Sequence, residues 1–307
     1  MFDIHTFDSG HAGPRLLVLG AVHGNEICGT VAATRVLGEL AAGQLRIVRG
    51  ALALVPVTNR MAYERRSRVG DRNLNRSLVP TSTPQDNEDR IANELCPLLA
   101  RHDVLLDLHS FHSAGKPFVM VGPHDNDGAL EPFSHAGKEE ALARCLGVAR
   151  AVDGWLDTYA TGAVRRGEAA RYGVGTTESM RTVGGYGVTL ECGQHDDPQA
   201  PHVAYRAIRN TLAHLGLVDE QPPTPAPVME TLRLSSVIDR EHADDRFARS
   251  WTSFDPVRAG DVIGSRASGA PVKAESDGFI VFPNERAVPG AEWFYFARSS
   301  DRLASPR

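Results

Sequence analysis

The stretch LLVLGAVHGNEICG, residues 16–29, sets the pattern on which the chain folds. Residues 16–22 form an almost continuous apolar run, which is typical of a strand buried on both faces of a sheet. A glycine-containing loop follows, and residues 30–42 then carry apolar side chains at helical spacing and stop at Gly43. Strand, loop and helix in this order predict one unit of an α/β fold, in which ligands bind at the carboxyl end of the strand.

The same alternation continues through the first two thirds of the chain. Apolar and β-branched runs predict four more strands, at 46–57, 104–109, 117–121 and 187–191. Apolar periodicity predicts two more helices, at 87–101 and 201–215, and Pro97 is expected to kink the first of them or to end it early. We therefore expect an α/β sandwich around a mixed or mostly parallel sheet.

The segment VDEQPPTPAPV, residues 218–228, has a different composition. Its prolines can continue neither a helix nor a central strand, so it is predicted to be a linker. It divides the chain into a catalytic domain, 1–217, and a second part, 229–307. Short β-rich runs separated by glycine turns, with no long helical period, predict that the second part is a small all-β domain.

Composition argues against several classes of protein. A net charge of −5 over 307 residues leaves no basic surface for nucleic acid. The four cysteines are widely spaced, without a C-x-x-C pair, which argues against a disulfide framework or a thiolate zinc site. No secretory signal pattern and no apolar run of about 20 residues is apparent. We expect a cytoplasmic protein without nucleic-acid or membrane partners, and a homo-oligomer stays open.

His23, Glu26 and His109 are candidate metal ligands. His23 and Glu26 lie in the loop that follows the first strand, and His109 ends the strand at 104–109. Two imidazoles and one carboxylate are a known ligand set of catalytic zinc sites. Alone, H-x-x-E is a weak signal, and a lone histidine in an apolar strand is usually a core residue. Strand alternation puts Asp107 on the same side as His109, where it can orient that ligand or serve a purely structural hydrogen bond.

Two further segments carry chemistry. Residues 57–78 are rich in Arg and Asn, which fits either a charged surface or a site that binds carboxylates through paired hydrogen bonds. Glu191 ends an apolar strand bordered by glycines. A carboxylate buried there should have a raised pKa, which suits a general base near neutral pH, although a surface glutamate ending a strand is the plain alternative.

Together these segments resemble one family. HGNE, N-x-x-A with R-x-x-D-x-N-L-N-R, DLH and TLECG, in this order over residues 23–191, are similar to the signatures of the succinylglutamate desuccinylase/aspartoacylase family. That family belongs with the zinc carboxypeptidase-like (M14-type) hydrolases. The resemblance implies an α/β/α sandwich with a mixed sheet, a small β-rich C-terminal domain and one Zn²⁺ per chain.

The resemblance also assigns roles to single residues. His23, Glu26 and His109 fall on the zinc ligands, and Glu191 falls on the catalytic glutamate. The remaining matches are Arg68 on the arginine that polarises the scissile carbonyl, Asn75 and Arg76 on the pair that grips the substrate carboxylate, and Arg181 on an arginine that meets a second substrate carboxylate. The match of Arg181 rests only on its position ten residues before Glu191.

The chain departs from the family pattern in a few places. Residues 59–62 read N-R-M-A where N-P-x-A is usual, and 71–76 read D-R-N-L-N-R where D-x-D-L-N-R is usual. Neither change is expected to touch a proposed ligand. The segment 110–118 matches no substrate signature, and Tyr295 is only a guess for the tyrosine that the family draws from its C-terminal domain.

The resemblance implies hydrolysis of the amide bond of an N-acyl amino acid or a related small N-acyl compound, with water activated by zinc and a glutamate as general base. A metallocarboxypeptidase acting on short peptides is the near alternative, because the same ligands and carboxylate grip would serve it. A non-catalytic zinc- or carboxylate-binding protein is the alternative from another class. The acyl group, the amino acid and the pathway stay open.

Overall fold

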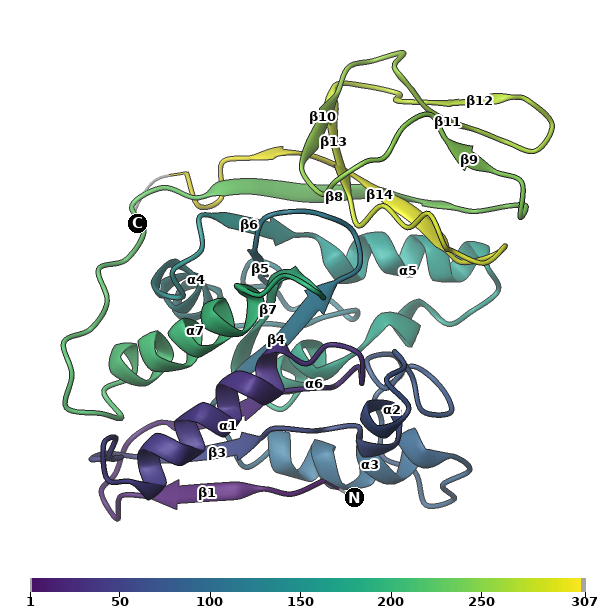
Figure 1. The fold of residues 1–307 in the computed structure, drawn as a ribbon. Coiled ribbons are helices and arrows are strands. Elements are labelled where there is room, and N and C mark those ends of the chain that lie inside the picture. The colour runs from purple at the N-terminus through teal and green to yellow at the C-terminus, as the bar shows by residue number, and fades with distance from the viewer. Residues whose placement is uncertain (1, 305–307) are drawn as a thin grey trace.

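A computed structural model describes residues 2–304 (Figure 1). Eleven strands of this region form one mixed sheet in the order β1-β3-β2-β4-β7-β5-β6-β8-β14-β13-β10. The strands of the N-terminal part are β1 (His5–Asp8), β2 (Arg15–Leu19), β3 (Ala51–Val55), β4 (Val104–Phe111), β5 (Phe118–Met120), β6 (Arg150–Asp153) and β7 (Tyr186–Gln194). At its centre, β3, β2, β4 and β7 run parallel to one another, so their carboxyl ends meet at one edge.

All five predicted strands are present; β2, β3 and β5 are shorter than predicted, whereas β4 and β7 extend further. β2 ends at Leu19 rather than at residue 22, because Ala21 adopts a left-handed φ of 46° that turns the chain off the sheet. β3 begins at Ala51 rather than at residue 46, after a turn in which Gly50 also has positive φ. The chain therefore leaves β2 early, and this leaves residues 20–27 to form the loop that carries the first candidate ligands.

The predicted helices are also present, within a larger set. They are α1 (Cys28–Ala41), α3 (Asn87–Leu99) and α7 (Ala200–His214), joined by α2 (Arg60–Glu64), α4 (Ala136–Cys145), α5 (Trp155–Arg165) and α6 (Thr176–Thr182). Pro97 does not end α3 early: the helix continues to Leu99, since Pro97 lies in its last turn. β6 and helices α4, α5 and α6 lie between residues 122 and 186, a region for which the sequence patterns predicted no element.

Helices cover both faces of the sheet, as an α/β/α sandwich requires. Leu16 and Val18 of β2 join a core with α1, α4 and α7, whereas Leu17 and Leu19 point to the other face and join a core with α3 and α6. This period of two explains why β2 has no polar alternation: both of its faces are buried. The predicted fold class is thereby confirmed.

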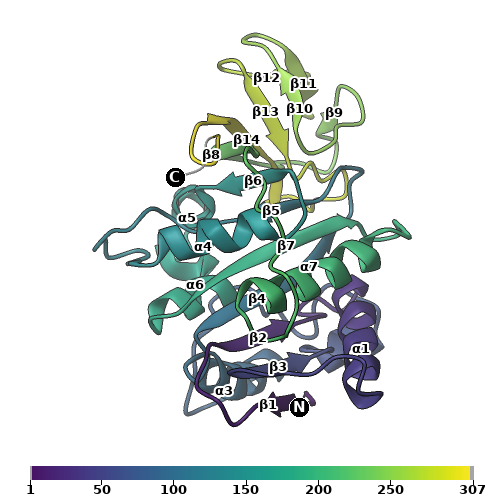
Figure 2. The same cartoon turned by 90° about the vertical axis from the view of Figure 1, so that its left-hand side faces the viewer.

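The C-terminal strands continue the same sheet. β8 (Glu230–Asp239) pairs in parallel with β6, and β14 (Glu292–Ser300), β13 (Gly278–Val281) and β10 (Asp255–Val257) follow in antiparallel order. Figure 2 shows the sheet rising from β1 at the bottom to these strands at the top. A separate small sheet joins β9 (Arg246–Phe247), β11 (Val262–Ser265) and β12 (Pro271–Lys273). The segment 218–228 has neither helix nor strand, and the division into domains at this segment stays a prediction.

None of the described helices is long and apolar enough to cross a membrane.

Candidate functional site

The candidate ligands and base lie at the carboxyl edge of the parallel strands. His23 and Glu26 come from the β2–α1 loop, whereas His109 and Glu191 are direct neighbours on the paired strands β4 and β7. The loop is held against the start of α2: a Cβ on Gly24 would lie only 2.0 Å from the backbone carbonyl carbon of Ala62. Gly24 of HGNE and Ala62 of N-x-x-A are thus in close backbone contact with each other.

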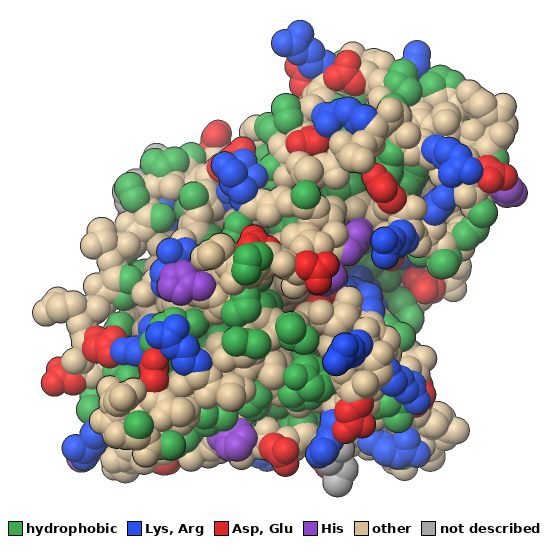
Figure 3. All heavy atoms as spheres, in the orientation of Figure 1, with side chains coloured by type: hydrophobic (Ala, Val, Ile, Leu, Met, Phe, Trp, Pro, Cys, Tyr) green, Lys and Arg blue, Asp and Glu red, His purple; other side chains and the backbone are tan. Residues whose placement is uncertain are grey.

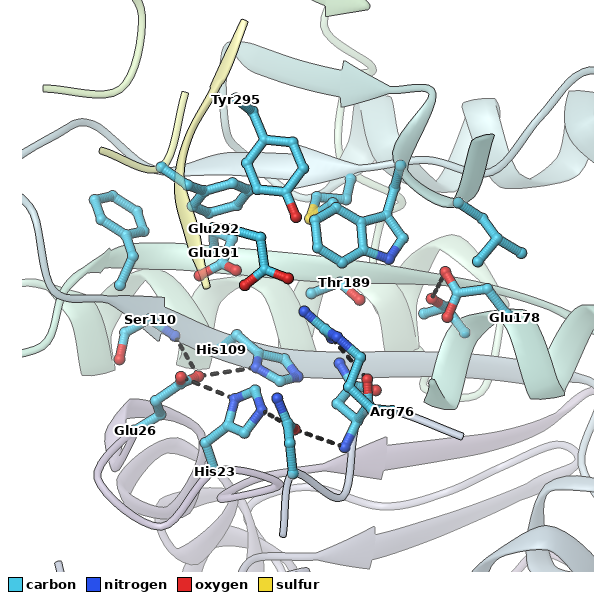
Figure 4. A pocket seen from close by; sticks show the side chains of 18 of the residues that line it. His23, Glu26, Arg76, His109, Ser110, Glu178, Thr189, Glu191, Glu292 and Tyr295 are labelled. Atoms are coloured by element: carbon cyan, nitrogen blue, oxygen red, sulfur yellow. Dashed lines mark hydrogen bonds and ion pairs between the residues drawn. The ribbon is translucent and has the colours of Figure 1, made fainter. Parts of the chain in front are cut away.

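The three candidate ligands form one buried cluster (Figure 4). One donor atom from each of His23, Glu26 and His109 lies within 4.8 Å of the others. Nδ1 of His23 is 2.9 Å from Oε1 of Glu26, and Nδ1 of His109 is 2.8 Å from Oε2 of the same carboxylate. All three residues are at most 3% exposed. Both imidazoles therefore present the same ring nitrogen to one carboxylate.

The opposite nitrogen of each imidazole is held by an acceptor. Nε2 of His109 donates to Oδ2 of Asp107 at 2.9 Å, as strand alternation predicted. Nε2 of His23 lies 3.0 Å from Oδ1 of Asn73, an oxygen that also accepts the backbone N–H of Asn75 and so leaves His23 as the donor. The expectation that the departure at 71–76 would not touch a proposed ligand was wrong, because Asn73 lies within it.

This arrangement leaves lone pairs facing one another. His23, which carries its hydrogen on Nε2, turns the lone pair of Nδ1 toward Glu26, whose oxygens are also acceptors. Burial alone would lower the pKa of His109, but the carboxylates of Asp107 and Glu26 raise it well above its usual value. Burial, and then the positive charge of Arg68, lower the pKa of His23 to about 4. Burial alone would raise the pKa of Glu26, but the two histidines hold it well below its usual value. A neutral His23 beside an ionised Glu26 is a donor set that a cation satisfies.

Glu191 lies beside the cluster and is 8% exposed. Burial, followed by the negative charge of Glu26, raises its pKa to about 8, against the opposing charges of His109 and Arg68. Its Oε2 has no hydrogen-bond partner among the described residues. Glu191 is thus a carboxyl group with a raised pKa, as the sequence predicted, although β7 continues past it to Gln194.

The basic residues of the R-x-x-D-x-N-L-N-R segment surround the same space. Arg68 pairs with Oε1 of Glu26 at 2.7 Å and is half exposed. The guanidinium of Arg76 packs over the rings of Trp155 and Tyr159, at 5.0 and 4.5 Å from their centroids. Within residues 2–304, no carboxylate lies within 4.0 Å of Arg76, so its charge is available to a ligand. Asn75 accepts the backbone N–H of Thr176 through Oδ1 at 2.9 Å, which fixes its side chain.

Arg181 reaches the same region but is bound to protein carboxylates. Its guanidinium donates to Glu139 at 2.9 and 3.1 Å, to Glu131 at 2.7 Å, and to the carbonyl of Gly187 at 2.9 Å. Oε1 of Glu178 lies 3.7 Å away. The side chain of Arg181 is 3% exposed. The role that resemblance assigns to it, meeting a second substrate carboxylate, stays a prediction, and these protein carboxylates compete for it.

All eight predicted site residues line one cavity of about 390 Å³. Figure 3 shows histidine and Lys or Arg side chains gathered on the surface where the C-terminal strands meet the larger part of the molecule. Sequence reasoning missed several lining residues, among them His112, Trp155, His195 and Glu292. His195 follows Glu191 by four residues and lies 2.8 Å from Oγ of Ser110, but no motif marked it. Tyr295 also lines the cavity, and its hydroxyl is buried without a partner among the described residues.

The family described as succinylglutamate desuccinylase/aspartoacylase catalytic domain matches residues 12–214. No curated protein sequence matches the chain.

Solved structures with the same fold cover nearly the whole chain. A succinylglutamate desuccinylase/aspartoacylase from Rhodobacter sphaeroides is 17% identical, with a TM-score of 0.73, covering 97% of this chain and 90% of that one. The ectoine utilization protein EutE (DoeB) from Ruegeria pomeroyi, in a product-bound structure, is 21% identical, with a TM-score of 0.73 and coverage of 96% and 88%. A succinylglutamate desuccinylase from Silicibacter sp. TM1040 is 20% identical, with a TM-score of 0.71 and coverage of 98% and 89%. These likenesses bear on the fold, whereas the family match covers about two thirds of the sequence. The chain therefore belongs to the succinylglutamate desuccinylase/aspartoacylase family, a family of hydrolases of the deacylase type.

Proposed function

We propose that this protein is a zinc-dependent deacylase that hydrolyses the amide bond of a small N-acyl amino acid. The observation that carries the proposal is the meeting of three groups in one cavity. These are a buried His-Glu-His cluster, an adjacent carboxyl group with a raised pKa, and an arginine without an ion-pair partner among residues 2–304. In this proposal the cluster binds the metal, the carboxyl group is the general base, and the arginine binds the substrate carboxylate.

The residues present fit a Zn²⁺ ion. His23, Glu26 and His109 would hold it through Nδ1, the carboxylate and Nδ1, because Asn73 and Asp107 already fix the opposite ring nitrogens. Two nitrogens and one oxygen suit zinc better than the all-oxygen preference of Mg²⁺ or Ca²⁺. When bound, the ion would polarise the substrate carbonyl and lower the pKa of a water molecule and of the neighbouring Glu191.

The chain's own residues would bind the substrate, transfer the proton and stabilise the developing negative charge. Arg76, with Asn75 beside it, binds the substrate carboxylate and so fixes the amide in the cavity. Glu191 takes a proton from the attacking water through Oε2, the oxygen without a protein partner, and then gives that proton to the leaving amine nitrogen. Arg68, which reaches the cluster from the solvent side, donates to the carbonyl oxygen as negative charge develops there.

Replacement of Glu191 by Gln tests the assignment of the base. The variant is expected to retain zinc, measured by elemental analysis, while its turnover of N-acyl amino acids falls about 100-fold or more. Glu275→Gln is a matched control, because Glu275 is exposed in the bend between β12 and β13, and it should change neither quantity. Full activity of Glu191→Gln with zinc retained would remove Glu191 from the mechanism.

Two alternatives are separated by the choice of substrate. A metallocarboxypeptidase would cleave short peptides faster than N-acyl amino acids that carry the same terminal residue. A non-catalytic zinc- or carboxylate-binding protein would hold zinc and turn over neither class. The Oε2 of Glu191 favours catalysis, because it has no hydrogen-bond partner among the described residues and is therefore free to take a proton.

A further inference from the structure

The surroundings of Arg181 contain more negative than positive charge. Three carboxylates, from Glu131, Glu139 and Glu178, lie within 4.0 Å of its guanidinium. Within residues 2–304, no second cation lies within that distance of any of the three. One positive charge therefore faces up to three negative ones in a buried environment, where charges are poorly screened.

The protonation of Glu131 reflects this excess. Burial, together with the charges of Glu178 and Glu139, raises the pKa of Glu131 to about 7 even though it pairs with Arg181 at 2.7 Å. A single guanidinium thus fails to compensate the group of carboxylates. Glu139 is fully buried and also accepts the backbone N–H groups of Gly122 and Gly187, so it belongs to the framework. Glu131 and Glu178, by contrast, line the cavity.

The acidic residues lie at a distinct end of the cavity. In Figure 4, Glu178 is on the far side of Arg76 and Thr189 from the cluster of His23 and Glu26. Met120, Trp155 and Leu156 add apolar lining to the same cavity. The cavity therefore offers a ligand apolar contacts as well as carboxylates.

The same cavity offers independent signs of a polar ligand. The hydroxyl of Tyr295, which is 3% exposed, has no hydrogen-bond partner among the described residues and points into the cavity. Among residues 2–304, no carboxylate lies within 4.0 Å of Arg76, and Glu292, which lines the same cavity, is paired with Arg166 at 3.1 Å. The cavity thus has one end for an anion and another for a cation.

We propose that the substrate is an N-acyl amino acid with one carboxylate, bound at Arg76, and a side chain ending in a cationic nitrogen, bound at Glu131 and Glu178. This inference rests on the proposed function and specifies its substrate. A second carboxylate in place of the cation would meet Glu131 and Glu178 and could reach Arg181 only by displacing them. Specificity then follows from repulsion of the wrong ligand as well as attraction of the right one.

Three nearly isosteric substrates test the proposal with the zinc-loaded protein. We expect kcat/KM to fall in the order Nα-acetyl-L-ornithine, Nα-acetyl-L-glutamine, Nα-acetyl-L-glutamate, with at least a tenfold difference between the first and the last. Preference for the glutamate compound would overturn the inference and leave the deacylase proposal intact. Hydrolysis of none of the three would count against the deacylase proposal.

Binding provides a readout that does not need turnover. L-ornithine and L-glutamate are the amino acids that hydrolysis of the first and the last of these compounds would release. Each is titrated against the same protein by calorimetry. Tighter binding of L-ornithine is expected, and equal or tighter binding of L-glutamate contradicts the inference whether or not any amide is cleaved.

A variant tests whether the preference for a cationic side chain depends on Glu178. Glu178→Gln preserves a side-chain oxygen for the backbone N–H of Gly175, which Glu178 now accepts at 2.9 Å, and so keeps the start of α6. It should lower kcat/KM for the ornithine compound about tenfold and change that for the glutamine compound little. An equal loss with both compounds would mean that Glu178 only supports the fold. Val183→Ala, at an exposed position just after α6, is the control variant and should change kcat/KM for neither compound.

Discussion

Asp107 is the residue at which the reasoning about the metal cluster can be tested most directly. It is fully buried in β4, accepts Nε2–H of His109 at 2.9 Å, and also accepts the hydroxyl of Thr176. These contacts fix which nitrogen of His109 carries its hydrogen and therefore turn Nδ1 toward Glu26. Loss of such an outer partner typically weakens metal binding 10- to 100-fold, or about 1.4–2.7 kcal/mol.

We expect Asp107→Ala to fall in this range and Asp107→Asn to lose less, because an amide oxygen can still accept from Nε2–H. The assay is competition for Zn²⁺ against a chelator of known affinity, with circular dichroism to show that each variant is folded. Asp103→Asn is the matched control, since Asp103 lies just before the other end of β4, in an exposed ion pair with Arg15. Such a pair contributes about 0–1 kcal/mol to stability and has no route to the metal.

A folded Asp107→Ala protein that binds Zn²⁺ as tightly as the Asp103→Asn control would contradict this expectation. In that case the orientation of His109 would not depend on Asp107.

Other perturbations are predicted from contacts and charges. Gly24→Ala should lower the free energy of unfolding by about 2 kcal/mol or more in urea titrations, because the new Cβ would lie 2.0 Å from the backbone of Ala62; Gly38→Ala, where nothing lies within 4 Å, should be neutral or stabilising. Glu131 has a folded-state pKa of about 7 against an ordinary value of 4.5, so the folded protein holds this proton more tightly and stability is lost as pH rises from 4.5 to 7. Denaturant titrations at several pH values should show that Glu131→Gln removes up to about 3 kcal/mol of this pH-dependent loss, and an unchanged slope would contradict the assignment. Arg76→Ala should raise KM and lower kcat/KM about 100-fold for an N-acyl amino acid, whereas the matched N-acyl amino acid amide, which lacks the carboxylate, should be affected little.

Much of the fold was predictable because it depends on local patterns. Continuous apolar runs identified the central strands, whose two faces are both buried, and helical periodicity identified α1, α3 and α7. The region between residues 122 and 186 was not predictable in the same way. Its strand β6 has only four residues, and α5 carries an aromatic face that packs against the C-terminal strand β8. Such elements are stabilised by partners distant in sequence rather than by a pattern of their own.

The outer contacts of the site were only partly predictable. Asp107 could be placed beside His109, because the two residues lie on one strand at a spacing of two. The contact of Asn73 with His23 joins residues 50 positions apart, and no local pattern indicates it. His195 likewise meets Ser110 across 85 positions. Each of these contacts depends on how separate loops pack against one another at the sheet edge.

Local sequence patterns were enough to indicate the candidate metal ligands and the candidate base, because these residues lie on or just after apolar strands. The electrostatic state of the site depends on contacts that form only when the chain is folded. The position of Arg181 in the sequence suggested an arginine that meets a substrate carboxylate, but Glu131 and Glu139, which lie 50 and 42 residues away along the chain, both pair with it. Electrostatic interactions depend on distance in space and on burial, and neither quantity can be read from separation along the chain.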